Sequence, residues 1–356
     1  MRKILTVVGA RPQFIKSAPV SFALQKIGLN EKLIHTGQHY DKMMSQTFFD
    51  ELNIPPPFTN LGVGSKSHGA QLASMIHKLE EIFTHERPEA VLVYGDTNST
   101  LAGALTACKL KIPLVHVESG LRSFNRTMPE EHNRTLTDHC SDLLICPTPR
   151  AVRNLENENI KNNVFLAGDT MKDAVRLFTP TAIKVSELLK KMGLDNQGFI
   201  LATLHRPYNT DDKQQLSKIL TSFASIKTPI ILPVHPRLDA QLKLHSLEIP
   251  SNICTTGPIG YFDMLALIQS SQLIVTDSGG LQKEAYFLSK QCITLRPETE
   301  WIETIELGWN RLVWGNIEVL EDEILNARGS SPSEKKNLFG DGYAAEKIAK
   351  ILKRFL

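Results

Sequence analysis

The sequence lacks several features that would place the chain in a specialised class of protein. It has 5 cysteines in 356 residues and no CxxC pair, which argues against a disulfide framework or a cysteine metal site. It has no apolar run of roughly 18 residues, so we expect no membrane span. The net charge of +2 gives no basis for binding nucleic acid or a membrane surface. We therefore expect a cytoplasmic protein without nucleic-acid or membrane partners.

Familiar cofactor and nucleophile motifs are missing as well. The chain has no GxGxxG fingerprint and no GxxxxGK[ST] phosphate loop, which argues against a nicotinamide cofactor. HExxH and HxH spacings are absent, and with them a histidine zinc site. No GxSxG turn is present to carry a serine nucleophile. The sequence therefore predicts neither a metal nor any other cofactor.

What the sequence does contain is a regular alternation of apolar runs of strand length with helical patterns. Continuous apolar strands separated by helices are typical of parallel sheets covered on both faces. We expect an α/β fold of two Rossmann-like, doubly wound domains with a cleft between them, at 1–170 and 171–332, and a C-terminal helix in 333–356 that packs back on the first domain. The expected strands fall in 3–9, 31–37, 90–96, 113–119, 142–148, 163–169, 199–206, 229–237, 252–258, 272–280 and 291–297.

Polar and ionisable side chains follow many of these strands. Ligands of open parallel sheets bind at the carboxyl ends of the strands. A structural protein does not need so many ionisable groups at one sheet edge, so we interpret them as a binding site. They are Arg11, Asp96, Glu118, His205, His235 and Ser278.

The segment LIVTDSGGLQKEA, at 273–285, is the most informative one. Ser278, Gly279 and Gly280 join a buried strand to a helix whose unpaired N–H groups and positive dipole end suit a phosphate. Glu284, farther along that helix, would reach a sugar hydroxyl. The alternative is a tight strand–helix turn without a ligand.

Two histidine motifs close strands in the same half of the chain. His205 with Arg206, beside the glycine loop, would form a diphosphate clamp, and His235 ends the neighbouring motif VHPR. Each histidine is also compatible with an ordinary loop position.

The first half offers cations and carboxylates. Arg11 and Lys16 near the first helix start suit a phosphate or a developing anion, although a solvated helix start would look the same. Asp96 either faces the cleft or caps the next helix. Glu118 and Glu130 suit acid/base chemistry if they converge with Asp96, whereas Glu130 could also serve only the dipole of its helix.

Seven motifs together resemble one family. GARPQFIK, VYGDTNST, HVESGLRS, MPEEHNR, LHR, VHPR and DSGGLQKEA, in this order and spacing, resemble the non-hydrolysing UDP-N-acetylglucosamine 2-epimerases over essentially the whole chain. The resemblance implies a glycosyltransferase-B-like fold, a homodimer, and inversion at C2 of a UDP-2-acetamido sugar by elimination and re-addition of UDP.

The resemblance also assigns residues. It implies catalytic positions at Asp96, Glu118, Glu130 and His205, with Asp96 as the leading candidate for the base. It implies functional positions at Arg11 and Lys16 and UDP binding by Ser278, Gly279, Gly280 and Glu284. We also expect Arg122, Arg206 and His235 to bind the substrate.

Two segments resemble a particular branch of that family. Residues 122–126 and 295–301 look more like members that act on UDP-2,3-diacetamido-2,3-dideoxy-glucuronate in surface polysaccharide synthesis, where Arg126 would meet the extra carboxylate. The rival hypotheses are a glycosyltransferase of the same fold, a hydrolysing epimerase that releases free UDP, and a non-catalytic UDP-sugar sensor.

Overall fold

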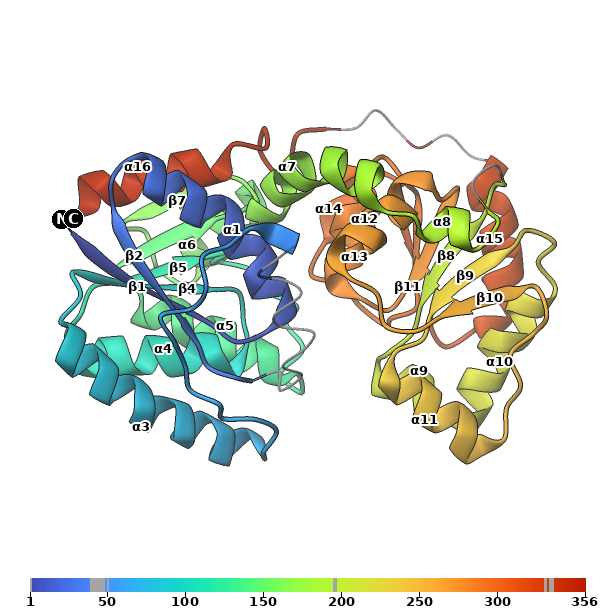
Figure 1. The fold of residues 1–356 in the computed structure, drawn as a ribbon, viewed down its shortest axis with the longest axis horizontal. Helices are drawn as coiled ribbons and strands as arrows, with labels where there is room; N and C mark the ends of the chain where they lie inside the picture. Colours follow the sequence, from blue (N-terminus) through green and yellow to red (C-terminus); the bar gives the residue numbers. More distant parts are fainter. Residues whose placement is uncertain (1, 39–48, 50, 195–196, 330–331, 333–335) are drawn as a thin grey trace. The chain divides into compact units, whose positions relative to one another are not determined.

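The protein consists of two compact α/β units. The computed structural model describes residues 2–38, 49, 51–194, 197–329, 332 and 336–356. The first unit comprises Met1–Arg176 and Asn337–Leu356, and the second comprises Leu177–Lys336. The division falls inside helix α7 (Thr170–Val185), and residues 333–335, at the expected start of the C-terminal segment, lie outside the described residues (Figure 1).

The described part of the first unit holds a parallel sheet of seven strands in the order β3-β2-β1-β4-β5-β6-β7. Neighbouring strands β1 and β4 are the point where the order reverses, and such switch points are where open α/β sheets bind ligands. The strands are β1 (Lys3–Val8), β2 (Asn30–His35), β3 (Thr59–Asn60), β4 (Ala90–Tyr94), β5 (Leu114–Val117), β6 (Leu143–Cys146) and β7 (Val164–Leu166).

Helices cover both faces of this sheet. Figure 1 shows α1 and α16 on one side and α3 and α4 on the other, as the uninterrupted burial of β4 requires. The helices are α1 (Arg11–Lys26), α3 (His68–Glu86), α4 (Asn98–Lys109), α5 (Pro129–Cys140), α6 (Pro149–Asn157) and α16 (Ala344–Phe355).

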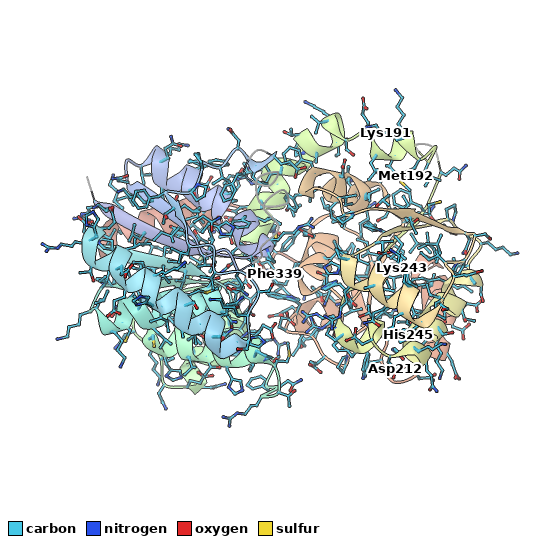
Figure 2. All side chains as sticks on the ribbon, turned by 60° about the horizontal axis from the view of Figure 1, so that its bottom comes forward. Lys191, Met192, Asp212, Lys243, His245 and Phe339 are labelled. Carbon is cyan, nitrogen blue, oxygen red and sulfur yellow. The ribbon has the colours of Figure 1, made fainter. Side chains whose placement is uncertain are left out.

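The C-terminal segment is fastened to the first unit by its backbone. The backbone N–H of Asp169 donates to the carbonyl of the buried Phe339 at 3.0 Å (labelled in Figure 2). Asp173 accepts the first two N–H groups of α16, from Ala344 at 3.1 Å and from Ala345 at 2.7 Å. A carboxylate at a helix N-terminus satisfies donors that the helix itself leaves unpaired.

The second unit repeats the design, with a six-stranded parallel sheet in the order β10-β9-β8-β11-β12-β13 among its described residues. Its order reverses between β8 and β11, so a second switch point lies there. The strands are β8 (Ile200–Thr203), β9 (Ile230–Pro233), β10 (Ile253–Thr256), β11 (Leu273–Thr276), β12 (Cys292–Thr294) and β13 (Asn310–Leu312).

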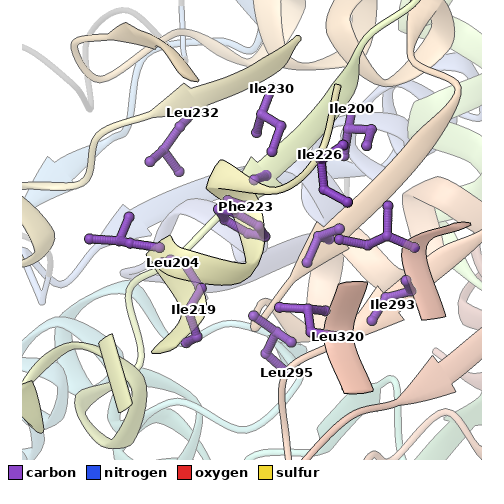
Figure 3. Close-up of a cluster of buried hydrophobic side chains, with 14 of the residues drawn as sticks. Ile200, Leu204, Ile219, Phe223, Ile226, Ile230, Leu232, Ile293, Leu295 and Leu320 are labelled. Atoms are coloured by element: carbon purple, nitrogen blue, oxygen red, sulfur yellow. The ribbon is translucent and has the colours of Figure 1, made fainter. Parts of the chain in front are cut away.

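The core of the second unit lies between this sheet and its helices. Phe223 of α10, Leu320 of α15 and strand residues such as Ile230 belong to one buried cluster (Figure 3). Asp212, labelled in Figure 2, begins α10 by accepting two backbone N–H groups. The helices are α8 (Leu188–Lys191), α9 (Pro207–Thr210), α10 (Lys213–Ala224), α11 (Pro236–His245), α12 (Tyr261–Ser270), α13 (Gly279–Phe287), α14 (Ile302–Glu306) and α15 (Leu320–Gly329), with a 3₁₀ turn at Ile317–Val319.

The predicted fold class is confirmed. Both units are parallel α/β structures, and each expected strand segment contains most of an observed strand. Strands β3 and β13 were not predicted. They are two and three residues long, too short for an apolar pattern to mark them.

Candidate active site

The candidate residues of the first unit follow the strands on either side of its switch point. Arg11 is the first residue of α1, three residues after the end of β1, and is half-buried. Asp96 follows β4 by two residues, and Glu118 directly follows β5. Parallel strands end at the same edge of a sheet, so the fold brings these three positions to one edge.

Lys16 and Glu118 form a buried ion pair at this edge. Lys16 Nζ lies 2.6 Å from Glu118 Oε2, and the two residues are only 8% and 7% exposed. Gly95 sits beside the pair, because a Cβ there would be 3.4 Å from Lys16 Nζ. The expected phosphate cation Lys16 is thus bound to a carboxylate in this structure.

Glu118 also has an unusual backbone. Its φ is +73°, a left-handed conformation that costs a residue with a side chain free energy. Its N–H and that of Ser119 both donate to the carbonyl of Ile145 at 3.0 Å, which holds the turn in place. Such outliers gather at functional sites, which favours a functional role for the Glu118 carboxylate.

Asp96 does not cap helix α4. Thr97 takes that position and accepts the N–H of Thr100, so the capping alternative is wrong. Asp96 Oδ2 instead accepts from Arg134 Nη2 at 2.5 Å, and the side chain remains 29% exposed. Its Oδ1 makes no hydrogen bond with any residue that the structure describes. One oxygen is therefore anchored and the other is available.

The two neighbouring acids of α5 differ in their surroundings. Glu131 is buried and accepts the backbone N–H groups of Ser123 and Phe124, each at 2.9 Å, together with Arg134 Nη1 at 2.9 Å. Glu130 is half-buried and makes no hydrogen bond or ion pair within the described part of the chain. Glu131 thus fixes the loop, and Glu130 is the member of the pair that remains available for a substrate.

A buried histidine that was not predicted joins two of these strand ends. His116 is fully buried, and its ring lies 2.7 Å from both Asp138 Oδ1 and the carbonyl oxygen of Gly95. Each ring nitrogen therefore contacts an acceptor oxygen. His116 therefore fixes the backbone just before Asp96, and its position in an otherwise apolar strand was the available sequence signal.

Arg122 belongs to the same buried network. Its guanidinium donates to Asp138 Oδ2 at 2.7 Å and to both carboxylate oxygens of Glu158, at 2.6 and 2.8 Å. Burial alone would raise the pKa of Asp138, but the charges and hydrogen bonds of His116 and Arg122 lower it. Arg122 was predicted to bind substrate, whereas these contacts favour a positioning role.

Gln13 is a second residue that sequence reasoning missed. Its Oε1 accepts the N–H groups of Gly9 and Ala10 at 2.8 and 3.1 Å, and its Nε2 donates to the carbonyl of Tyr94 at 2.9 Å. The side chain thereby ties the end of β1 to the end of β4, across the switch point.

In the second unit, Asp277 holds the His205 motif. His205 Nδ1 lies 2.9 Å from Asp277 Oδ1, and the backbone N–H groups of His205 and Arg206 donate to Oδ2 at 3.0 and 2.9 Å. Burial would raise the pKa of Asp277, but the His205 hydrogen bond and charge, with the backbone donors, lower it. Asp277 fixes the ring so that Nε2 is left for a ligand.

The glycine loop begins helix α13 as expected. Ser278 is its N-cap residue, and its Oγ and carbonyl accept from Leu281 and Gln282, each at 3.4 Å. The N–H groups of Gly279 and Gly280 donate to no residue that the structure describes. This geometry is that of an anion site at a helix N-terminus.

The remaining candidates surround this loop or its neighbours. Arg206 is half-buried at the start of α9. His235 is exposed, begins α11, and its ring centroid lies 5.7 Å from that of His205. Glu284 is 6% exposed in the second turn of α13.

The described residues contain no cluster of three or more His, Cys, Asp or Glu that could hold a metal ion. In the same part of the chain, no helix is both long and apolar enough to cross a membrane. The groups described above at the two sheet edges are carboxylates, an imidazole, cations and backbone amides. Such groups can move protons and stabilise a leaving phosphate.

Comparison with known proteins identifies relatives across the whole chain. Residues 23–353 match the family model of UDP-N-acetylglucosamine 2-epimerase. The chain is 47% identical to a UDP-N-acetylglucosamine 2-epimerase homolog of Methanococcus maripaludis, over 99% of each protein. It is 43% identical to the UDP-2,3-diacetamido-2,3-dideoxy-D-glucuronate 2-epimerase of Pseudomonas aeruginosa, over 98% of this chain and 99% of that protein.

A solved structure also resembles the chain over nearly its whole length. The crystal structure of Methanocaldococcus jannaschii UDP-GlcNAc 2-epimerase in complex with UDP-GlcNAc and UDP matches with a TM-score of 0.90 and 41% sequence identity, over 99% of each chain.

Proposed function

Because the chain belongs to the UDP-N-acetylglucosamine 2-epimerase family, an isomerase family, we propose that it inverts C2 of UDP-N-acetylglucosamine without hydrolysis. The observation that carries this proposal is the match, over 99% of the chain, to an enzyme whose crystal structure contains UDP-GlcNAc and UDP. Fold alone would not carry it, since one fold hosts many reactions.

The first step of the proposed reaction is elimination of UDP. The C2 proton of a closed sugar ring has no neighbouring carbonyl to make it acidic, so direct abstraction is unfavourable. Instead the C1–O bond breaks and its electron pair leaves with UDP. The C2 proton passes to a base, and a glycal remains. Asp96 suits the base because Arg134 anchors one of its oxygens and leaves Oδ1 available.

The second step reverses the first on the other face of C2. A proton is delivered to C2 and a UDP oxygen bonds to C1 again, so no atom is gained or lost. Two faces require two acid/base groups. Glu118 and Glu130 take the proton-transfer and cation-stabilising roles, because the ring carries positive charge while the C1–O bond is broken.

UDP must remain bound between the two steps. The amides of Gly279 and Gly280 at the start of α13 bind its phosphates, and Glu284 binds a ribose hydroxyl. His205, with its ring fixed by Asp277, meets the leaving phosphate through Nε2. Arg11 and Arg206 add positive charge, and His235 supports the ring of His205.

The test is to incubate the protein with UDP-N-acetylglucosamine alone and follow the sugar by NMR. The proposal expects a mixture of the gluco and manno UDP-sugars without accumulation of free UDP. Free UDP that grows in step with released sugar would identify a hydrolysing enzyme. A strict need for an acceptor would identify a transferase.

A second candidate substrate is UDP-2,3-diacetamido-2,3-dideoxy-glucuronate, favoured by the Pseudomonas aeruginosa relative. Arg126 is exposed in the loop before α5, where it would meet the carboxylate at C6 of that sugar. Arg126→Gln should then raise KM for the uronate and leave KM for UDP-N-acetylglucosamine unchanged. Equal effects on both sugars would exclude this role for Arg126.

We also expect a cytoplasmic homodimer. Light scattering coupled to size-exclusion chromatography should give twice the 39.8 kDa mass of the chain.

A further inference from the structure

One buried cation of the second unit has no role in the function proposed above. Arg296 lies two residues beyond β12 and is only 2% exposed. Its Nη2 is 3.1 Å from Glu300 Oε2, but its Nη1 is buried and without a hydrogen-bond partner. A buried guanidinium N–H with no acceptor is costly, and native structures rarely retain one without a reason.

The unpartnered nitrogen points at the beginning of α13. A Cβ on Gly279 would lie 3.3 Å from Arg296 Nη1 and 2.8 Å from Glu300 Oε1. The charged ends of the Arg296–Glu300 pair therefore lie directly beside Gly279. The unpartnered Nη1 of Arg296 thus lies next to Gly279, whose amide begins α13.

Other contacts hold the loop that carries Arg296 firmly against α13. Gln282 Oε1, on the second turn of the helix, accepts from Thr299 Oγ1 at 2.7 Å and from Asn310 Nδ2 at 3.0 Å. The Arg296 guanidinium is therefore positioned before a ligand arrives, which limits the conformational entropy lost on binding.

We propose that Arg296 binds the diphosphate of the UDP-sugar at the N-terminus of α13, and that Glu300 neutralises its charge while the site is unliganded. The planar guanidinium suits two phosphate oxygens at once. Glu300 and the phosphate then compete for the same cation. This inference rests on the proposed function and adds to it a binding residue and an internal competitor.

The test measures UDP and uridine binding by calorimetry for the wild type, Arg296→Gln, Arg296→Lys and Glu300→Gln. Arg296→Gln should weaken UDP binding by about 10- to 100-fold, because a charge-assisted hydrogen bond is lost, and leave uridine binding unchanged. Arg296→Lys should keep part of the affinity for UDP. Glu300→Gln should bind UDP several-fold more tightly than the wild type, because the competing charge is removed.

Arg311→Gln is the matched control. Arg311 lies on neighbouring β13, pairs with Glu323 at 2.8 Å, and has no part in the proposed phosphate binding. Its replacement should leave UDP affinity unchanged.

Each contrary outcome has a definite meaning. Wild-type affinity for UDP in Arg296→Gln, or an equal loss for UDP and uridine, would overturn the inference while the proposed function stands. If Arg296→Gln fails to fold, Glu300→Gln decides, because unchanged or weaker UDP binding there also overturns it. A wild-type protein that does not bind UDP would refute the proposed function itself.

Discussion

The buried pair of Lys16 and Glu118 gives the sharpest prediction about the first unit. The two charged atoms are 2.6 Å apart, and both residues are over nine-tenths buried. Replacing Glu118 by Gln, or Lys16 by Met, leaves the other charge buried without its partner. Replacing both removes the two charges together.

The expected magnitudes follow from that geometry. With an effective dielectric constant near 20, charges this close attract by about 6 kcal/mol before desolvation is subtracted. Removing one partner of a buried pair typically lowers the free energy of unfolding by about 3–5 kcal/mol. The double variant should lose much less free energy of unfolding than the two single variants lose together, which gives a coupling energy of at least about 2 kcal/mol.

Urea denaturation of the four proteins in this cycle measures the coupling directly. Asp239 and Lys243 provide a matched control, because that pair on α11 is similarly close at 2.7 Å but more than half exposed. Its coupling should stay below about 1 kcal/mol. If the Lys16 and Glu118 replacements were additive, the pair would not be the buried contact described above, and the positioning of Glu118 would need another explanation.

Three further predictions concern groups that hold the backbone or a catalytic side chain in place. Asp277→Asn should lower kcat/KM by about 10-fold or more through the loss of the His205 contact. Because the Asp277 pKa lies below 3.8 in the folded protein, its stabilising contribution should persist above that pH and disappear in acid titrations below it. Burial raises the pKa of Asp173 from 3.8 to about 6, so the free energy of unfolding should fall by up to roughly 3 kcal/mol as the pH rises from 4 to 7. Urea titrations of Asp173→Asn should show a weaker dependence of this free energy on pH, and an unchanged dependence would contradict the prediction. Gly120→Ala should lower the free energy of unfolding by more than about 3 kcal/mol in thermal unfolding, because φ is +79° and a Cβ would clash with the carbonyl oxygen of Ala151. Gly28→Ala, at +77° with open space around it, should cost only about 1–2 kcal/mol, and equal costs would refute the steric argument.

The architecture was predictable because buried parallel strands leave an unmistakable apolar pattern. The ends of those strands then pointed to the candidate residues, and the structure places Asp96 and Glu118 beside the first switch point. The glycine loop was predictable for a similar reason, since Ser278 lies between a buried strand and an amphipathic segment, where serine commonly caps a helix.

The partners of these residues were not predictable from the sequence. Which cation meets which carboxylate depends on side chains far apart in the chain, such as Arg134 and Asp96 or Lys16 and Glu118. Helix-capping preferences allow Asp96 as the N-cap of α4, but Thr97 occupies that position in the structure. His116 looked like one polar residue in a strand until the fold brought Asp138 to its ring.

The most direct test of the account is to run the reaction with UDP-N-acetylglucosamine alone in deuterated water. Elimination and re-addition require that the proton at C2 come from solvent, so the manno product should carry deuterium at C2, and Asp96→Asn should suppress both exchange and product. Epimerised product that retains its original hydrogen at C2 would contradict the account.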